Sequence, residues 1–232
     1  MYQAEIEEHY QKMWHQALPL IRSNQTFHDP YLCGKPDTRK GITLLARINA
    51  PVNSAICEFL HELRALEPEQ YYYPSGDLHV TVMSVLSCIE GYQLSVLDKP
   101  KYVDLIDSIV KNFPCFGVEF NGITLADSGV LLRGYVNNQS LEQLRDTLRF
   151  DIKNSDAPHS LDKRYTIVTA HCTVMRFRKK LQNPMHFADY LVDNQQRYFG
   201  RVDVAQLELV VNDWYQRHAN TDLLSAPFLT DN

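Results

Sequence analysis

Two short segments of the sequence carry the same pair of chemically active side chains at the same spacing. The first contains His79 and Thr81, the second contains His171 and Thr173, and in both a Val-Met pair follows the Thr. Each segment lies in an apolar run that is rich in β-branched residues and too short for an ordinary helix, which predicts a buried or half-buried strand. Because strand side chains alternate between faces, each His should face the same side as its Thr.

Two such imidazoles are suited to in-line displacement at phosphorus, which needs one proton taken from the attacking oxygen and another given to the leaving oxygen. The ordinary pKa of His, about 6.5, lets one ring be neutral and the other protonated at about pH 7. The Thr hydroxyls would hydrogen-bond the non-bridging phosphate oxygens, where charge accumulates. Two His without nearby carboxylate ligands make a poor site for Mg²⁺ or Zn²⁺, so no metal or other cofactor is predicted. The predicted catalytic residues are therefore His79, Thr81, His171 and Thr173.

The elements that must position these residues alternate between strands and helices. Strands are predicted at 42–49, 78–87, 116–125, 130–136, 167–177 and 202–211, and helices at 53–66, 102–113, 140–152 and 185–192. This order is β-α-β-α-β twice, an internal duplication. It predicts one bilobal α/β (α+β) domain over 41–232, with lobes at about 41–127 and 128–232. Two antiparallel-containing sheets, flanked by helices, would surround a central cleft in which the two imidazoles face each other.

Residues 1–40 form an extension in front of this domain. Apolar side chains recur at helical spacing over 3–21, which predicts an amphipathic helix that packs on the outside of the domain. Binding of a partner by this helix is the alternative. The stretch from Ser23 to Gly41 contains Pro, Gly and basic residues and is interpreted as a long loop, of a length that is often functional, so that it could cover a site.

Composition limits the classes of function. The 232 residues are 44% hydrophobic, enough for a sizeable core, and the net charge of −5 provides no overall basic field for duplex nucleic acid or an anionic membrane. No run approaches the length of a membrane span, and the first ten residues contain no apolar signal region, so a cytoplasmic location is expected. The five cysteines are odd in number and widely spaced, which favours reduced thiols over disulfides or a zinc site. Cys172 should face the core and not the cleft, which argues against a thiol nucleophile.

The two motifs resemble those of the 2H phosphoesterase superfamily, which includes 2'-5' RNA ligase-like proteins and 2',3'-cyclic nucleotide phosphodiesterases. The run from Tyr73 to Thr81, with a Pro before Leu-His-x-Thr, is similar to the first motif of that family, and the run from His171 to Arg176 is similar to the second. The resemblance covers about residues 41 to 212. Ala170 departs from it, because a Pro often precedes the second His. The resemblance implies a duplicated fold and substrates among cyclic phosphates of RNA ends, small cyclic nucleotides and 2'-5' linked oligonucleotides.

Two further residues are candidates for substrate binding. Tyr73, the last of three consecutive tyrosines, could stack on a base, although packing explains such a run equally well. Arg176 begins the densest basic cluster of the chain and could contact a phosphate. In a regular strand, however, Arg176 would lie on the face opposite His171, so a solvated strand end is the alternative.

The function predicted from these observations is metal-independent hydrolysis of a 2',3'-cyclic phosphate or a related ribose phosphodiester, with the two His as general acid and base. The expected partner is a nucleotide or a short RNA end that carries the cyclic phosphate, and a monomer is expected. A 2'-5' RNA ligase would use the same site in reverse. A protein that binds a nucleotide or RNA end without turnover is a third interpretation, which two intact proton carriers disfavour.

Overall fold

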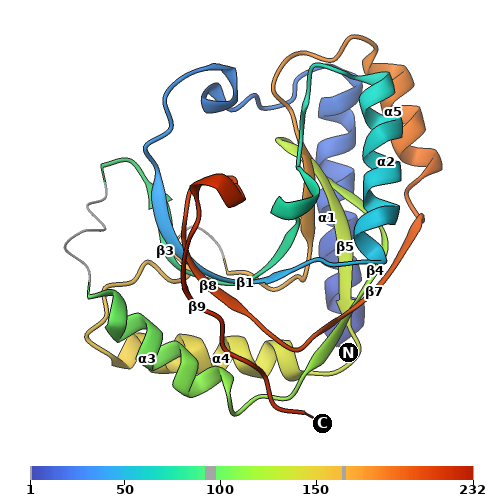
Figure 1. The fold of residues 1–232 in the computed structure, drawn as a ribbon. Helices are drawn as coiled ribbons and strands as arrows, with labels where there is room; N and C mark the ends of the chain where they lie inside the picture. The colour runs from blue at the N-terminus through green and yellow to red at the C-terminus, as the bar shows by residue number, and fades with distance from the viewer. Residues whose placement is uncertain (1, 92–97, 164–165, 232) are drawn as a thin grey trace.

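Two antiparallel β-sheets form the body of the protein in the computed structural model, which describes residues 2–91, 98–163 and 166–231 (Figure 1). One sheet has four strands in the order β3-β1-β8-β9, and the other has five in the order β2-β6-β5-β4-β7. The strands are β1 (Lys40–Arg47), β2 (Tyr71–Tyr72), β3 (His79–Ile89), β4 (Phe116–Ala126), β5 (Gly129–Val136), β6 (Cys172–Arg176), β7 (Tyr198–Val204), β8 (Glu208–Asn212) and β9 (Asp222–Ser225). The helices are α1 (Tyr2–Arg22), α2 (Val52–Leu66), α3 (Lys99–Val110), α4 (Ser140–Asn154) and α5 (Pro184–Asp193).

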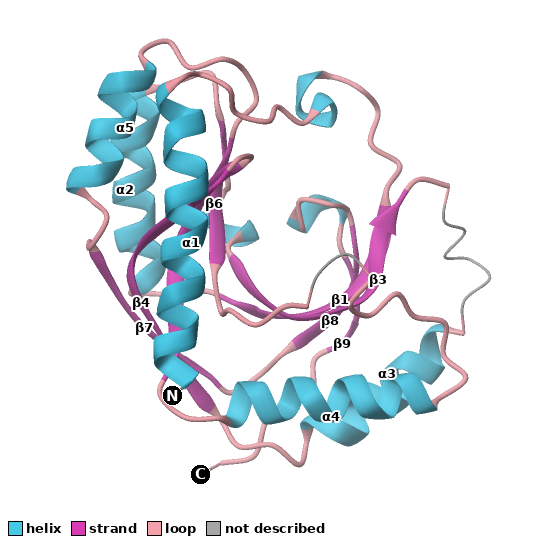
Figure 2. Cartoon of the chain, turned by 180° about the vertical axis from the view of Figure 1, so that it is seen from behind, coloured by secondary structure: helices cyan, strands magenta, loops and turns pink. Residues whose placement is uncertain are grey.

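The helices cover the two sheets separately. Helices α1 and α2 pack against strands of the five-stranded sheet and α5 packs against α1, whereas α3 and α4 pack on each other and against strands β9 and β3 of the other sheet (Figure 2). The predicted amphipathic helix of the extension is confirmed as α1. Its buried side chains recur every three or four residues: Ile6, Tyr10, Trp14, Ala17 and Ile21. Because the sheet and α5 already occupy this apolar stripe, α1 does not offer it to a partner.

Each sheet contains strands from both predicted halves of the chain. Strands β2 and β4, from the first half, lie in the five-stranded sheet, and β8 and β9, from the second half, lie in the four-stranded sheet. The sheets therefore do not coincide with the ranges 41–127 and 128–232. The single strand predicted at 202–211 is wrong, because the chain leaves one sheet after β7 and enters the other at β8. The C-terminal segment contacts the chain between β7 and β8, because the Leu207 N–H donates to the Pro227 carbonyl at 3.0 Å.

Both motif strands begin later than the sequence indicates. His79 is the first residue of β3, and His171 immediately precedes β6, which starts at Cys172 and not at the predicted residue 167. Both histidines therefore lie at the entry of a strand, where the preceding loop can reach the ring.

A β-bulge interrupts each motif strand one residue after its Thr. In β3, Thr81 pairs with Leu45 and Met83 with Leu44, so Val82 is an extra residue. A bulge of this kind shifts the alternation of side chains by one position.

In β6 the bulge has the same place in the motif. Thr173 pairs with Leu131 and Met175 with Val130, so Val174 is the extra residue. The equivalent position of the two bulges is a structural trace of the duplication that the motifs indicate.

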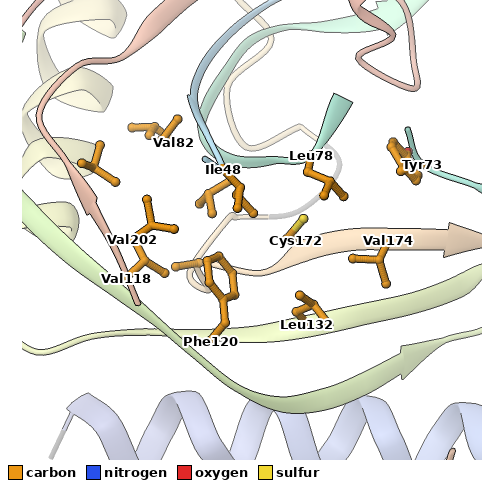
Figure 3. Close-up of a cluster of buried hydrophobic side chains, with 14 of the residues drawn as sticks. Ile48, Tyr73, Leu78, Val82, Val118, Phe120, Leu132, Cys172, Val174 and Val202 are labelled. Atoms are coloured by element: carbon orange, nitrogen blue, oxygen red, sulfur yellow. The ribbon is translucent and has the colours of Figure 1, made fainter. Parts of the chain in front are cut away.

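The apolar core lies between the sheets and under the helices. Figure 3 shows the sulfur of Cys172 directed into an apolar cluster, on the side of Leu78, and this side chain has no exposed surface. Burial raises the pKa of the Cys172 thiol to about 12. The thiol therefore stays protonated at neutral pH and faces the core, as strand alternation predicts, and it is not placed to act as a nucleophile.

Candidate active site

A cleft between the two motif strands brings the predicted catalytic residues together. His79 and Thr81 of β3 line it together with His171 and Thr173, which come from the entry and body of β6. The remaining wall comes from four places: β1 (Thr43), the rest of β3 (Met83, Ser84, Ser87, Cys88), the segment before β6 (Ser160, Asp162, Lys163, Ile167) and the end of β8 with the residues after it (Asn212, Trp214, Gln216). Arg176 and Tyr73 complete it.

The ring of His79 is anchored by the backbone two residues before it. Its Nδ1 lies 2.7 Å from the Asp77 carbonyl oxygen, which can only accept, so Nδ1 must carry a hydrogen and Nε2 is the free nitrogen. The carboxylate of Asp77 accepts a hydrogen bond from the His218 N–H at 2.8 Å, which ties this loop to the C-terminal part of the chain. The ring is only 8% exposed and therefore has little freedom to turn.

The ring of His171 is anchored at the equivalent position by a side chain. Its Nδ1 lies 2.7 Å from the hydroxyl oxygen of Thr169, which is also two residues earlier. A hydroxyl can donate or accept, so this contact alone does not assign the tautomer of His171.

Burial favours the neutral form of both rings. It lowers the pKa of His79 to about 4, an effect that the hydrogen bond to the Asp77 carbonyl partly opposes. It lowers the pKa of His171 to about 3, and the positive charge of Arg145 adds to the effect of burial. The pKa of each ring therefore lies below the ordinary value that the sequence analysis assumed, and the neutral form of both rings is favoured at pH 7.

Arg145 ties the two motif segments together from α4. Its guanidinium donates to the carbonyls of Val82 and Thr81 in β3, at 2.9 and 2.8 Å. It also donates to the carbonyl of Thr169, at 2.9 Å. The side chain is almost fully buried. The sequence analysis missed this residue, because an Arg in an amphipathic helix pattern gives no sign that it points inward.

Arg176 lines the cleft, as His171 does, because the strand is not regular, the condition on which Arg176 was expected on the opposite face. The bulge at Val174 explains the difference, because the extra residue reverses the alternation between Thr173 and Arg176. Its Nε donates to the hydroxyl of Tyr73 at 2.8 Å. Within the described part of the chain no carboxylate forms an ion pair with Arg176, so its charge is available to an anionic ligand.

Tyr73 does not provide a stacking platform. Only 2% of its surface is exposed, and its ring packs edge-on against Tyr71, with centroids 5.2 Å apart. The residue contributes its hydroxyl, which holds Arg176. Trp214, half-buried, is a second aromatic side chain that lines the cleft, and the sequence analysis missed it. No local signal marks Trp214, which reaches the cleft only because β8 crosses into the four-stranded sheet.

The hydroxyls of the cleft are arranged for contact with a ligand. Among the hydrogen bonds of the described residues, none involves the hydroxyl of Thr81 or Thr173. Ser84 and Ser87 follow Thr81 at intervals of three residues along β3, and all three line the cleft. A regular strand would turn every second residue inward, and the register shifts of β3 account for the longer interval.

The loop of the extension forms a second cavity beside the cleft. Phe27, Tyr31 and Arg39 line this cavity, and it shares Arg176 and Trp214 with the cleft. The loop is thus placed next to the site that the sequence suggested it could cover, and its role in covering that site stays a prediction.

Two properties of the described residues bear on ligand chemistry. In the ranges 2–91, 98–163 and 166–231, no three His, Cys, Asp or Glu side chains gather as a metal site would require. No helix in these ranges combines the length and apolarity that crossing a membrane demands.

Solved structures of other proteins share this fold, although no protein-family model matches the sequence and a search of curated proteins finds no relative. TT0787 of Thermus thermophilus superposes with a TM-score of 0.59 at 15% identity, over 82% of this chain and 97% of its own. A protein described as a phosphoesterase gives 0.55 at 17% identity, over 83% and 99%. E. coli LigT complexed with 3'-AMP gives 0.53 at 16% identity, over 83% and 99%. At these identities the likeness is one of fold, and the predicted fold class is confirmed: this chain has the two-sheet fold of LigT.

Proposed function

We propose that the protein is a member of the 2H phosphoesterase superfamily and hydrolyses a 2',3'-cyclic phosphate or a related ribose phosphodiester without a metal ion. The observation that carries this proposal is the cleft itself. Two imidazoles from equivalent positions of a duplicated motif line it, together with two Thr hydroxyls and an arginine, none of which has a hydrogen bond or ion pair to a carboxylate within the described residues. Proton carriers on both sides and donors for the non-bridging oxygens are the parts that in-line phosphoryl transfer requires.

The contacts of the two rings support a division of roles. The Asp77 carbonyl accepts from Nδ1 of His79 and so favours the charged form of that ring, whereas Arg145 opposes the charged form of His171. When the phosphodiester anion enters, its charge favours proton uptake, and His79 is the ring that takes the proton more readily. His79 is therefore assigned as the general acid and His171 as the general base.

The reaction then proceeds in one displacement. Nε2 of His171 takes a proton from water as the water oxygen bonds to phosphorus. The bond from phosphorus to one ribose oxygen breaks, and Nε2 of His79 gives its proton to that oxygen. Thr81, Thr173 and Arg176 hold the remaining phosphate oxygens, whose charge grows in the transition state. The product is a ribonucleoside monophosphate or an RNA end with one phosphate.

A substrate screen tests this proposal. The purified protein is incubated with 2',3'-cyclic mononucleotides, with RNA that ends in a cyclic phosphate and with 2'-5' linked oligonucleotides, each with and without excess EDTA. We expect hydrolysis of at least one class, undiminished by the chelator and lost in the His79→Gln, His171→Gln double variant.

Three results would reject the proposal. The first is loss of turnover in EDTA with recovery on adding a divalent ion. The second is tight binding of a nucleotide without turnover, which identifies a binding module. The third is that the protein joins RNA ends and shows no hydrolysis, the reaction of a ligase.

A further inference from the structure

The second cavity, which the loop of the extension lines, adjoins the cleft and is larger. It has a volume of about 510 Å³, whereas the cleft has about 140 Å³. Pockets that enclose a small ligand measure roughly 300 to 1,000 Å³, so the cleft alone is too small for a whole nucleotide. Arg176 and Trp214 line both spaces, which therefore meet at these side chains. A ligand whose phosphate lies beside the two histidines can extend past Arg176 into the second cavity.

The extension loop is a fixed wall of this cavity, because it is held to both sheets. On one side the Phe27 N–H donates to the Asp127 carbonyl, in the turn between β4 and β5, at 2.8 Å. On the other side the Lys35 ammonium donates to the carboxylate of Glu90, directly after β3, at 3.2 Å. The loop thus passes from the five-stranded sheet to the four-stranded sheet (Figure 1). Its residues lie outside the range that carries the family resemblance.

The charges of the cavity favour an uncharged occupant. Arg39 forms ion pairs with Asp29 at 3.3 Å and with Asp37 at 2.8 Å, so its charge is balanced within the loop. The carboxylate of Asp127 also lines the cavity and would repel a second phosphate. The other cation of the wall, Arg176, lies at the boundary with the cleft, where the reacting phosphate would be. A neutral part of the substrate therefore suits this space better than a further phosphate.

Phe27 is the most exposed of the aromatic side chains that line the cavity. Its exposed fraction is 53%, whereas Tyr31 and Trp214 are half-buried. The ring of Tyr31 already contacts two cations, with Lys35 at 4.3 Å and Arg39 at 3.9 Å from its centroid. Stacking on an exposed aromatic ring is available to every nucleobase, because every base has a π-face. Phe27 is thus the ring of this wall that best suits a base.

We infer that the extension loop forms the base subsite of the enzyme, in which the nucleobase attached to the reacting ribose phosphate stacks on Phe27. The inference rests on the proposed function for the position of the phosphate. It deepens that function by naming a nucleotide, and not a sugar phosphate alone, as the substrate. The extension then recognises the base, while the four motif residues act on the phosphodiester.

The test compares two substrates that differ only at the base: adenosine 2',3'-cyclic phosphate, and methyl riboside 2,3-cyclic phosphate, in which a methoxy group replaces the base. In the wild type kcat/KM should be on the order of 10-fold higher for the nucleotide, the usual size of one base–ring stack. Phe27→Ala should remove most of this preference by lowering the value for the nucleotide alone. Phe150→Ala is the matched control and should change neither value, because Phe150 is 68% exposed on α4 and lines neither cavity.

A binding measurement provides a readout that needs no turnover. The chain has two tryptophans: Trp14, which is 4% exposed in α1, and Trp214, which lines the cavity. Adenosine 3'-monophosphate should quench the fluorescence of Trp214, and methyl riboside 3-phosphate, which has the same charge, should not. The quenching should be absent in Trp214→Phe. In Phe27→Ala its midpoint should move to a concentration on the order of 10-fold higher.

The outcomes separate this inference from the proposed function. Binding that depends on the base and on Phe27, without hydrolysis of any cyclic phosphate, would support the subsite and reject the hydrolytic function. Equal kcat/KM for the two substrates, or equal affinity for the two monophosphates when neither substrate is hydrolysed, would overturn the subsite. Equal losses for both substrates in Phe27→Ala would also overturn it, because the ring would then support the loop and not the base.

Discussion

His79 and His171 occupy equivalent places in two copies of one motif, yet they are anchored by different chemistry. Each ring contacts the residue two positions before it, but His79 meets a backbone carbonyl and His171 meets a side-chain hydroxyl. A carbonyl has one possible role, whereas a hydroxyl takes its direction from its next partner. The tautomer of His79 is thus decided by the backbone next to it, whereas the contact with Thr169 leaves both tautomers of His171 open.

Two identical motifs would have no reason to act differently on a substrate, so the proposed division into acid and base has to come from their surroundings. Here the carbonyl of Asp77 favours the cation on one side, and Arg145 opposes it on the other. Substitutions at each of these contacts test whether the two rings differ in this way.

The largest expected effect is at the two rings themselves. Replacing either His by Gln should lower turnover on a ribose phosphodiester roughly 10²- to 10⁴-fold, the worth of one positioned proton carrier. A nitrophenyl ester separates the roles, because its leaving group departs without a proton. On that ester His79→Gln should recover most of the lost rate and His171→Gln should not. If the rate on the nitrophenyl ester recovers in His171→Gln and not in His79→Gln, the roles of acid and base are the reverse of those assigned.

Replacing Arg145 should destabilise both motif segments. Arg145→Met leaves three backbone carbonyls without their donor, for an expected loss of roughly 3 kcal/mol in the free energy of unfolding. Urea denaturation measures this. Lys153→Met on the same helix, which breaks only a surface ion pair with Asp162, should cost less than about 1 kcal/mol. Equal losses in the two variants would contradict the role of Arg145.

The pH dependence of stability follows from the depressed pKa of both rings. In the unfolded chain each His has a pKa of about 6.5, so below that pH the unfolded state binds protons that the folded state refuses. Stability is therefore full above about pH 6.5 and falls as the pH is lowered toward 4. With a folded-state pKa of about 4, His79 accounts for roughly 2 to 3 kcal/mol of the stability lost between pH 6.5 and 4.5. The variant His79→Gln should not lose this amount. The free energy of unfolding is measured between pH 6.5 and 4.5 in both proteins. If its pH dependence is the same in His79→Gln as in the wild type, the ring is not buried as a neutral group.

The smallest expected effect is a difference in KM between variants of the two residues that follow the bulges. Ser84 and Arg176 are both five residues beyond their His and both line the cleft, but only Arg176 carries a charge. Arg176→Met should raise KM for a phosphodiester roughly 10-fold or more, and Ser84→Ala less than about 10-fold, as charged and neutral hydrogen bonds differ. Tyr73→Phe, which removes the holder of Arg176, should lie between them. A KM for Arg176→Met no higher than for Ser84→Ala would remove Arg176 from the phosphate site.

Features with local signals could be predicted from the sequence. Sequence patterns predicted each helix of the described residues, among them the buried stripe of α1, and the repeated His-x-Thr pattern predicted which residues meet in the cleft. Such signals survive folding because the period of side chains along a helix or strand reflects which face is buried. The catalytic role of the four motif residues stays a prediction.

Features that depend on distant partners could not be predicted from the sequence. Whether a strand joins one sheet or the other, as β7 and β8 show, is a matter of pairing that no local pattern encodes. The bulges at Val82 and Val174 are visible only against the neighbouring strand, and they bring Arg176 to the cleft. The depressed pKa of each histidine and the contacts of Arg145 with both motif segments arise from groups that the fold alone assembles. These are long-range interactions, and they make two equal motifs into an unequal pair.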